Sequence, residues 1–280
     1  MTGLDPRLTL ARADLADAAL EGIVAATRYA RPTAMRCGAP ATAVLREPAA
    51  GAEQRDQLLC GEAFDALEII EGWAWGQARR DGYVGYVRLA DLAEFGLPPT
   101  HQVATLRAGL YAEPDLKSRV LGRFSLNSLL RPGDERSGDF VQVPALAGWI
   151  PARCLAPIGR YAEDAAAIAL LFVGAAYVWG GREAGGLDCS GLVQQALFAC
   201  GRTCPRDTDQ QQGLGAPVAA DSLRRGDLVF WPGHVAMMID AARIVHASGD
   251  HAAVVVEPLA EAIQRREAGG KGRPTARRRP

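Results

Sequence analysis

The chain has few lysines, no long apolar run and no excess of charge of either sign. Lys117 and Lys271 are its only lysines, so nearly all basic side chains are arginine, which we interpret as a compositional bias rather than a functional signal. No stretch approaches the roughly 18 consecutive apolar residues of a membrane-spanning helix. The formal net charge of −1 gives no sign of a nucleic-acid or membrane partner.

The sequence also lacks an export signal and a zinc-binding pattern. Residues 1–20 have no basic segment followed by an apolar one, so we expect a cytoplasmic protein. Six cysteines fall at irregular spacings without a pair of CxxC elements, which argues against a zinc site. We expect no metal, no organic cofactor, and reduced structural thiols at every cysteine except Cys189. The other five are Cys37, Cys60, Cys154, Cys200 and Cys204.

The N-terminal half contains an internal repeat. Residues 43–92 and 109–155 each begin with a short apolar strand that ends in Glu-Pro. They end in Gly85-Tyr86-Val87 and Gly148-Trp149-Ile150, each with a leucine six residues after the aromatic. Short strands broken by Gly and Pro every 8–12 residues or so are typical of small all-β barrels. The pattern resembles tandem bacterial SH3-like domains, which we place at residues 36–97 and 98–158.

We predict one further segment at each end of the chain. Residues 1–35 form a lead segment, in which Leu15, Ala18 and Ala19 predict a short helix that begins near Asp14 and packs along the barrels. Residues 271–280, KGRPTARRRP, are basic and contain proline, so we predict a disordered tail. A nucleic-acid-binding arm is the alternative for this tail. Residues 159–270 remain for a separate domain.

Cys189 has the sequence setting of a reactive thiol. It follows the glycine-rich stretch YVWGGREAGGLD and opens a segment whose apolar residues recur at steps of three and four, which predicts a helix. The free N–H groups and the dipole at a helix N-terminus favour a thiolate over a thiol. A nucleophilic cysteine also needs a base within hydrogen-bond reach and a third group that orients the base.

The chain has four histidines that could serve as this base: His101, His234, His246 and His251. His234 begins the apolar run HVAMMI, and His246 lies in the next run, RIVHAS, after a short turn. Two antiparallel strands joined by that turn would bring His234 and His246 close together. Either histidine alone is more often a satisfied core residue, but together with a helix-opening cysteine they indicate catalysis.

Four motifs in this half resemble those of the NlpC family of papain-like murein peptidases, over about residues 159–262. They are Asp188-Cys189-Ser190-Gly191, Gly226-Asp227-Leu228-Val229-Phe230, Gly233-His234-Val235 and Val245-His246-Ala247. The resemblance implies Cys189 as nucleophile, His234 as general base and acid, and His246 as the orienting residue. It implies an α+β fold with the cysteine helix packed on a small antiparallel sheet, and Tyr177 near the oxyanion site. Asp227 is expected to be a structural turn residue.

The expected reaction is amide hydrolysis through a thioester. When paired with a histidine, papain-type cysteines have a pKa as low as about 3–4, so we expect a preformed thiolate–imidazolium pair at neutral pH. The whole chain further resembles γ-D-glutamyl-L-diamino acid peptidases of the dipeptidyl-peptidase VI type, through LLCGE (58–62), DGYVGYV (81–87) and PRDTDQQ (205–211). That resemblance implies murein peptides with a free N-terminal L-Ala as substrates.

Five residues are candidates for binding such a substrate: Asp188, Ser190, Arg206, Glu62 and Tyr83. Asp188, Glu62 and Tyr83 could capture the ammonium group of L-Ala, and Arg206 could pair with a substrate carboxylate. Ser190 could hydrogen-bond to substrate. Each of the five also has a purely structural interpretation, as a helix-turn, loop or barrel residue.

Other classes of protein share parts of this pattern. A peptidoglycan endopeptidase or amidase acting on the polymeric wall would use the same catalytic residues, with the SH3-like domains as wall-binding modules. A toxin-like effector, a binding protein with an inactive peptidase fold, and a lipid acyltransferase are weaker alternatives. The sequence leaves open the identity of the diamino acid, the stem-peptide length and the oligomeric state.

Overall fold

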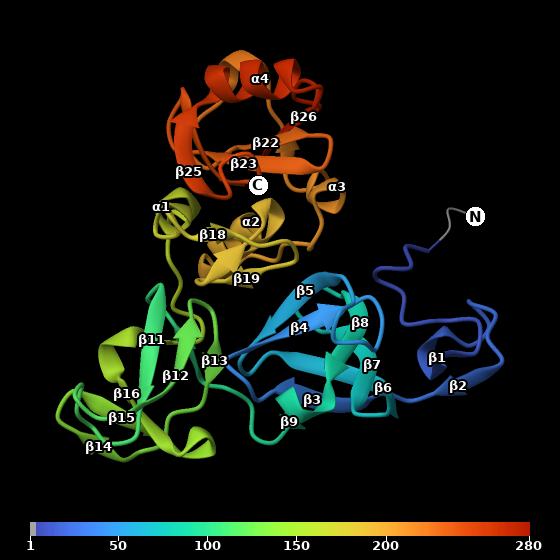
Figure 1. Cartoon of the computed structure of the whole chain (residues 1–280), viewed down its shortest axis with the longest axis vertical. Helices are drawn as coiled ribbons and strands as arrows, with labels where there is room; N and C mark the ends of the chain where they lie inside the picture. The colour runs from blue at the N-terminus through green and yellow to red at the C-terminus, as the bar shows by residue number, and fades with distance from the viewer. Residues whose placement is uncertain (1–3) are drawn as a thin grey trace. The chain divides into compact units, whose positions relative to one another are not determined.

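The computed structural model describes residues 4–280, which divide into two compact units (Figure 1). The N-terminal unit extends to Pro157 and the C-terminal unit runs from Ile158 to Pro280. This division lies one residue from the predicted end of the second barrel at residue 158.

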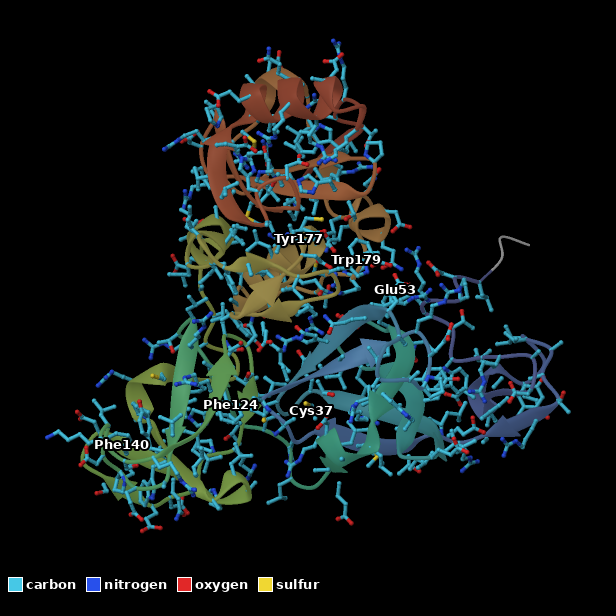
Figure 2. The ribbon with its side chains drawn as sticks, viewed as in Figure 1. Cys37, Glu53, Phe124, Phe140, Tyr177 and Trp179 are labelled. Atoms are coloured by element: carbon cyan, nitrogen blue, oxygen red, sulfur yellow. The ribbon has the colours of Figure 1, made fainter. Side chains whose placement is uncertain are left out.

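The first barrel is a seven-stranded sheet in the order β5-β4-β8-β7-β6-β3-β9. Its core contains Cys37, which is labelled in Figure 2, together with Val44, Phe64 and Val87, each from a different strand. The strands are β3 (Thr33–Cys37), β4 (Ala41–Leu45), β5 (Gln54–Leu59), β6 (Ala63–Ile70), β7 (Trp73–Ala78), β8 (Val84–Arg88) and β9 (Leu92–Glu94), with a 3-10 turn at Leu89–Asp91.

The second barrel combines a five-stranded sheet, β12-β11-β16-β15-β14, with a three-stranded sheet, β13-β10-β17. Phe124, Leu110 and Ile150 lie in its core (Figure 2). The strands are β10 (His101–Val103), β11 (Arg107–Tyr111), β12 (Val120–Ser125), β13 (Leu129–Leu130), β14 (Arg136–Ser137), β15 (Phe140–Val143), β16 (Gly148–Pro151) and β17 (Leu155–Pro157), with 3-10 turns at Pro144–Leu146 and Ala152–Cys154.

The two Gly-aromatic motifs occupy equivalent places in the two barrels. Tyr86 of β8 pairs with Leu45 of β4, and Trp149 of β16 pairs with Tyr111 of β11. The glycine before each aromatic lies against a neighbouring strand: a Cβ on Gly85 would meet a Val44 methyl at 2.5 Å. A Cβ on Gly148 would meet Leu110 at 2.8 Å. The glycine of each repeated motif is therefore explained by the close approach of a neighbouring strand.

The lead segment differs from its prediction. The helix predicted near Asp14 is wrong, because β1 (Leu15–Asp17) pairs in parallel with β2 (Arg28–Ala30) and only a 3-10 turn, Ala18–Leu20, lies between them. Leu15 is instead buried with Trp75 of the first barrel, and the Arg12 guanidinium lies 4.1 Å from the centre of the Trp75 ring. Burial against the barrel outweighs a helical propensity that spans less than two turns.

The C-terminal unit is built on a nine-stranded sheet in the order β19-β20-β18-β25-β24-β23-β22-β26-β21. Helix α2 packs on β23 and β24, while α4 covers the face that carries Trp231, Ala236 and Ile244 (Figure 1). The predicted α+β class is confirmed. No helix among residues 4–280 is long and apolar enough to cross a membrane.

The bounds of these elements follow. The helices are α1 (Ala165–Leu170), α2 (Cys189–Ala199), α3 (Thr208–Gln211) and α4 (Leu259–Ala268), with a 3-10 turn at Ala220–Ser222. The strands are β18 (Ala176–Tyr177), β19 (Arg182–Glu183), β20 (Gly186–Leu187), β21 (Ala216–Pro217), β22 (Leu228–Trp231), β23 (His234–Met238), β24 (Arg243–Ser248), β25 (Ala253–Pro258) and β26 (Ala276–Arg279).

The basic tail is ordered, so the prediction of disorder for residues 271–280 is wrong. Ala276–Arg279 forms β26, which pairs antiparallel with β22 and supplies hydrogen bonds to a strand that would otherwise be an edge. Arg279 also donates to both carboxylate oxygens of Asp227 at 2.8 Å. Asp227 is buried and also accepts the backbone N–H of Arg224, which agrees with its predicted structural role.

Candidate active site

Cys189 is the first residue of α2 and is nearly buried. Asp188 caps the helix by accepting the N–H of Gly191 at 2.7 Å, so the chain turns into the helix directly at the thiol. The backbone N–H of Val235 donates to the Cys189 sulfur. Because Val235 follows His234 in β23, this contact places the thiol beside the start of the strand that carries the predicted base.

Asp188, Ser190 and Arg206 form a buried cluster behind the nucleophile. Asp188 accepts five hydrogen bonds, from the N–H groups of Gly180 and Gly191, the Ser190 hydroxyl and two nitrogens of Arg206. Arg206 is 1% exposed and also donates to Ser190. These bonds hold the start of α2 in place, and the substrate-binding roles of the three residues stay predictions.

The predicted pair of histidines does meet. His234 Nε2 lies 2.7 Å from His246 Nδ1, and both side chains are buried. The register Met237↔Val245 puts the two histidines diagonally across β23 and β24 on one face of the sheet. The hairpin expected from the sequence is therefore confirmed, with the turn at Asp240 held by its side chain, which accepts the N–H of Ala242.

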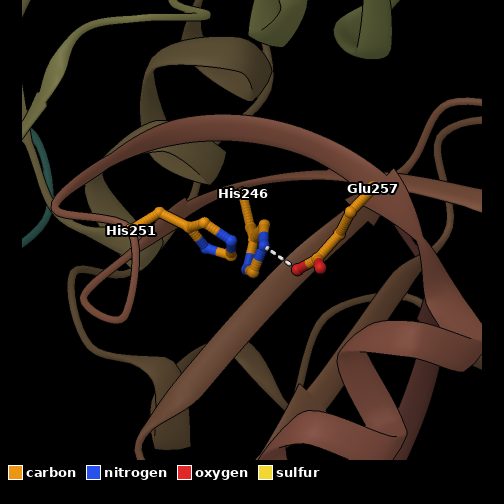
Figure 3. A group of neighbouring side chains, drawn as sticks. All are labelled: His246, His251 and Glu257. Atoms are coloured by element: carbon orange, nitrogen blue, oxygen red, sulfur yellow. Dashed lines mark hydrogen bonds and ion pairs between the residues drawn. The ribbon is translucent and has the colours of Figure 1, made fainter.

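A third strand extends this chain of hydrogen bonds. His246 Nε2 lies 2.7 Å from Glu257 Oε1 (Figure 3). Arg265 of α4 forms two hydrogen bonds with the same carboxylate. Glu257 is on β25, where Ile244↔Glu257 and His246↔Val255 are neighbouring pairs, so it shares the face of His246. The hydrogen-bonded chain His234–His246–Glu257–Arg265 therefore runs across three strands and ends on helix α4. Sequence reasoning missed Glu257 and Arg265.

These contacts fix the tautomers of both imidazoles. A carboxylate only accepts hydrogen bonds, so His246 carries its proton on Nε2 and its Nδ1 has a lone pair. That lone pair accepts a hydrogen bond from the N–H at Nε2 of His234, which leaves the Nδ1 lone pair of His234 available as a base. The Cys189 thiol, which accepts the N–H of Val235, the residue after His234, is the predicted source of the proton for this lone pair. The carboxylate of Glu257 therefore acts on the predicted base through His246, without reaching the reacting atoms.

His246, His251 and Glu257 also have ligand atoms within 4.8 Å of one another, the size of a metal site (Figure 3). Both ring nitrogens of His246 are already in hydrogen bonds, and His251 Nδ1 lies 2.9 Å from the Ser248 hydroxyl. Glu257 is paired with Arg265. We assign His246 and Glu257 to the hydrogen-bond relay, meaning the chain His234–His246–Glu257–Arg265, because a metal would have to displace these partners.

The electrostatics favour neutral forms of both reacting groups in the free protein. Burial and the neighbouring Asp188 raise the pKa of Cys189 to about 11. Burial, together with His246 and Arg266, lowers the pKa of His234 well below its usual value. These directions differ from the preformed ion pair that we expected from the pairing of a papain-type cysteine with a histidine, because burial disfavours the charged form of both groups. If Cys189 is the nucleophile, as predicted, its proton would have to pass to His234 during attack on a substrate.

We expect kcat/KM to keep its plateau below pH 6.5. The base must be neutral, and the lowered pKa of His234 places its protonation below the ordinary value of about 6.5. The lowered pKa of His234 also affects stability. The unfolded chain binds a proton at His234 that the folded chain does not, so the free energy of unfolding falls as pH falls below about 6.5. A pH profile of kcat/KM and the ultraviolet thiolate absorbance of the native protein against Cys189→Ala check this. Strong thiolate absorbance at neutral pH would contradict it.

Tyr177, labelled in Figure 2, lines a pocket of about 460 Å³. His234 is also in the wall of this pocket. The Tyr177 hydroxyl has no hydrogen-bond partner among residues 4–280, and burial raises its pKa, so it stays protonated and can donate. This agrees with a place near an oxyanion, although its catalytic role stays a prediction. The other lining residues are Pro232, Gly233, Gly249, Asp250, Arg266, Gly270, Lys271 and Gly272.

Glu62 and Tyr83 belong to the first barrel. The two carboxylate oxygens of Glu62 accept hydrogen bonds from the Leu59 N–H at 3.0 Å and from Arg80 at 2.8 Å. Tyr83 is buried, and its backbone N–H donates to Asp81. Ammonium capture by Glu62 and Tyr83 stays a prediction.

Comparisons with known proteins agree with this geometry. Residues 174–271 match the NlpC/P60 family. The C-terminal unit is a member of the NlpC/P60 family of cysteine peptidases. Residues 44–92 match the bacterial dipeptidyl-peptidase SH3 domain. The chain therefore joins an NlpC/P60 domain to at least one bacterial SH3 domain of the dipeptidyl-peptidase type.

The similarity to named relatives extends beyond the NlpC/P60 domain. The chain is 27% identical over 225 residues to dipeptidyl-peptidase 6 of Lysinibacillus sphaericus, covering 72% of this chain and 83% of that protein. It is 30% identical over 114 residues to the γ-D-glutamyl-L-lysine dipeptidyl-peptidase of Bacillus subtilis, covering 38% of each. An NlpC/P60 family crystal structure from Bacillus cereus has the same fold, with a TM-score of 0.73 and 20% identity over 88% of this chain and 99% of that one.

Proposed function

We propose that the protein hydrolyses the bond between γ-D-Glu and a diamino acid in murein-derived peptides with a free N-terminal L-Ala. The proposed chemistry rests on one observation: His234, His246 and Glu257 are linked by hydrogen bonds beside a thiol at the start of a helix. The substrate class is supported by two relatives that are named dipeptidyl-peptidases, and the name of one of them includes γ-D-glutamyl-L-lysine. A cytoplasmic role in recycling cell-wall peptides is part of the same proposal.

The geometry suggests the following proton movements. The Cys189 sulfur attacks the amide carbon while its proton passes to Nδ1 of His234, and Tyr177 and the Cys189 N–H donate to the oxygen that becomes negative. The C–N bond breaks as His234 returns the proton to the leaving amine, which leaves a thioester on Cys189. Water then attacks the thioester, gives a proton to His234, and the thiol departs with that proton restored.

The proposed substrate specificity is tested with three substrates. These are the L-Ala-γ-D-Glu-diaminopimelate tripeptide, its N-acetylated form and intact sacculi, with products identified by mass spectrometry and with Cys189→Ala as the blank. Cleavage of the free tripeptide alone, at the γ-D-Glu bond, is the expected result. Cleavage of the blocked peptide or of sacculi would overturn it and favour a hydrolase of the polymeric wall, with the SH3-like barrels as binding modules.

A further inference from the structure

Arg266 is a buried arginine without a carboxylate partner. It lies on α4 with 8% of its surface exposed, and its guanidinium is 5.4 Å from the centre of the Trp231 ring. Its Nε has no hydrogen-bond partner, and no ion pair links it to any residue within 4–280. Burial lowers its pKa, which reflects the cost of keeping this cation away from water. A buried charge that is left unpaired is costly unless a ligand supplies the counter-charge.

The neighbouring carboxylates are committed to other cations. Glu257 forms two hydrogen bonds with Arg265 and a third contact with His246. Asp250 forms an ion pair with Lys271 and lies 3.6 Å from Arg265, and it attracts Arg266 only from a longer distance. Three cations therefore face two carboxylates, and the excess positive charge lies at Arg266.

This charge faces the catalytic pocket. Arg266 and Lys271 both line the cavity of about 460 Å³ that has His234 in its wall, while Cys189, Asp188 and Ser190 are not among its lining residues. In the proposed reaction His234 protonates the leaving amine, so the space on its side of the thiol receives the residue that carries this amine. Arginine pairs with carboxylates in a planar, two-bond geometry that lysine does not offer.

We propose that Arg266 is the main cation of a carboxylate-binding subsite, which holds the α-carboxylate of the residue whose amine leaves, with Lys271 adding positive charge at the rim. This rests on the proposed function, since it places the diamino acid of the substrate in that pocket. A substrate that ends at the diamino acid presents this carboxylate free, whereas a longer stem converts it into an amide. The subsite therefore selects tripeptides over longer stems.

The test compares L-Ala-γ-D-Glu-L-Lys, its C-terminal amide and the tetrapeptide extended by D-Ala. For the native protein we expect kcat/KM to be about 10- to 100-fold higher for the free acid, the effect of a hydrogen-bonded buried charge. In Arg266→Gln that ratio should fall to near one, and in Arg266→Lys to an intermediate value. Arg273→Gln is the matched control, because Arg273 is an exposed arginine that pairs with Glu267 outside the pocket.

Equilibrium binding of the same three peptides to Cys189→Ala gives a second measurement that needs no turnover. Equal hydrolysis of the acid and the amide by the native protein, or equal binding of the two by Cys189→Ala, would overturn the subsite but not the peptidase activity. This outcome does not depend on whether Arg266→Gln folds. A preference for the acid that persists unchanged in Arg266→Lys and Arg266→Gln also overturns it. If none of the peptides is cut or bound, the proposed function fails, and the subsite with it.

Discussion

Replacing Cys189 with alanine is expected to lower kcat for peptide hydrolysis by about 10⁴-fold or more, because it removes the sulfur that would form the thioester. The thiol lies at the N-terminus of α2 and accepts the N–H of the residue that follows His234. Alanine retains the helix start, since Asp188 forms its capping bonds with the backbone and with Arg206 rather than with the sulfur. The loss should therefore occur in chemistry and not in folding, as rates and circular dichroism together would show.

Cys200 offers the matched control at the other end of the same helix. It is the C-cap residue of α2, partly exposed, and its side chain is remote from the pocket that contains His234. Cys200→Ala is expected to keep native kcat. Full activity in Cys189→Ala, or an equal loss in both variants, would remove Cys189 from the nucleophile role.

The features that could be predicted from sequence depend on local spacing. The thiol at Cys189 opens a helix after a glycine-rich turn, and the two histidines lie on strands joined by a short turn, so their meeting follows from one hairpin. The Gly-aromatic motifs of the barrels are likewise local, and each reports one strand contact. Such features need no knowledge of how distant segments pair.

Features that depend on pairing between distant segments were missed. Glu257 meets His246 only because β25 adopts the register His246↔Val255, and a lone glutamate in AVVVEP carries no signal of that register. The basic tail forms β26 because it pairs with the edge of β22 and because Arg279 pairs with the buried carboxylate of Asp227. Both partners lie about 50 residues earlier in the sequence. The ion pair between Arg206 and Asp188 was likewise not predicted, because it joins a loop residue to the residue that precedes α2.

Glu257→Gln is expected to lower kcat by about 10²- to 10⁴-fold, as when an orienting carboxylate becomes an amide in other triads. An amide can donate its N–H to His246 Nε2, which moves the proton of His246 to Nδ1. His246 then donates to His234 Nε2, and the remaining proton of His234 lies on Nδ1, where the base is needed. The same hydrogen-bond lengths can persist while the base is lost. Glu257→Asp keeps the charge with a shorter reach and should recover part of the rate.

The tautomers distinguish this role from a structural one. Nitrogen NMR of the imidazoles should show the proton of His246 on Nε2 in the native protein and on Nδ1 in Glu257→Gln, with melting temperature measured alongside. Glu267→Gln is the control, because Glu267 is an exposed glutamate of α4 that pairs with Arg273 away from the relay. Hydrogen bonds from Arg265 and His246 outweigh burial and lower the pKa of Glu257 to about 2, so the carboxylate stays ionised wherever the enzyme is folded and active. Loss of activity in Glu257→Gln with unchanged tautomers would refute the relay, since the carboxylate would then act only by supporting β25 and α4.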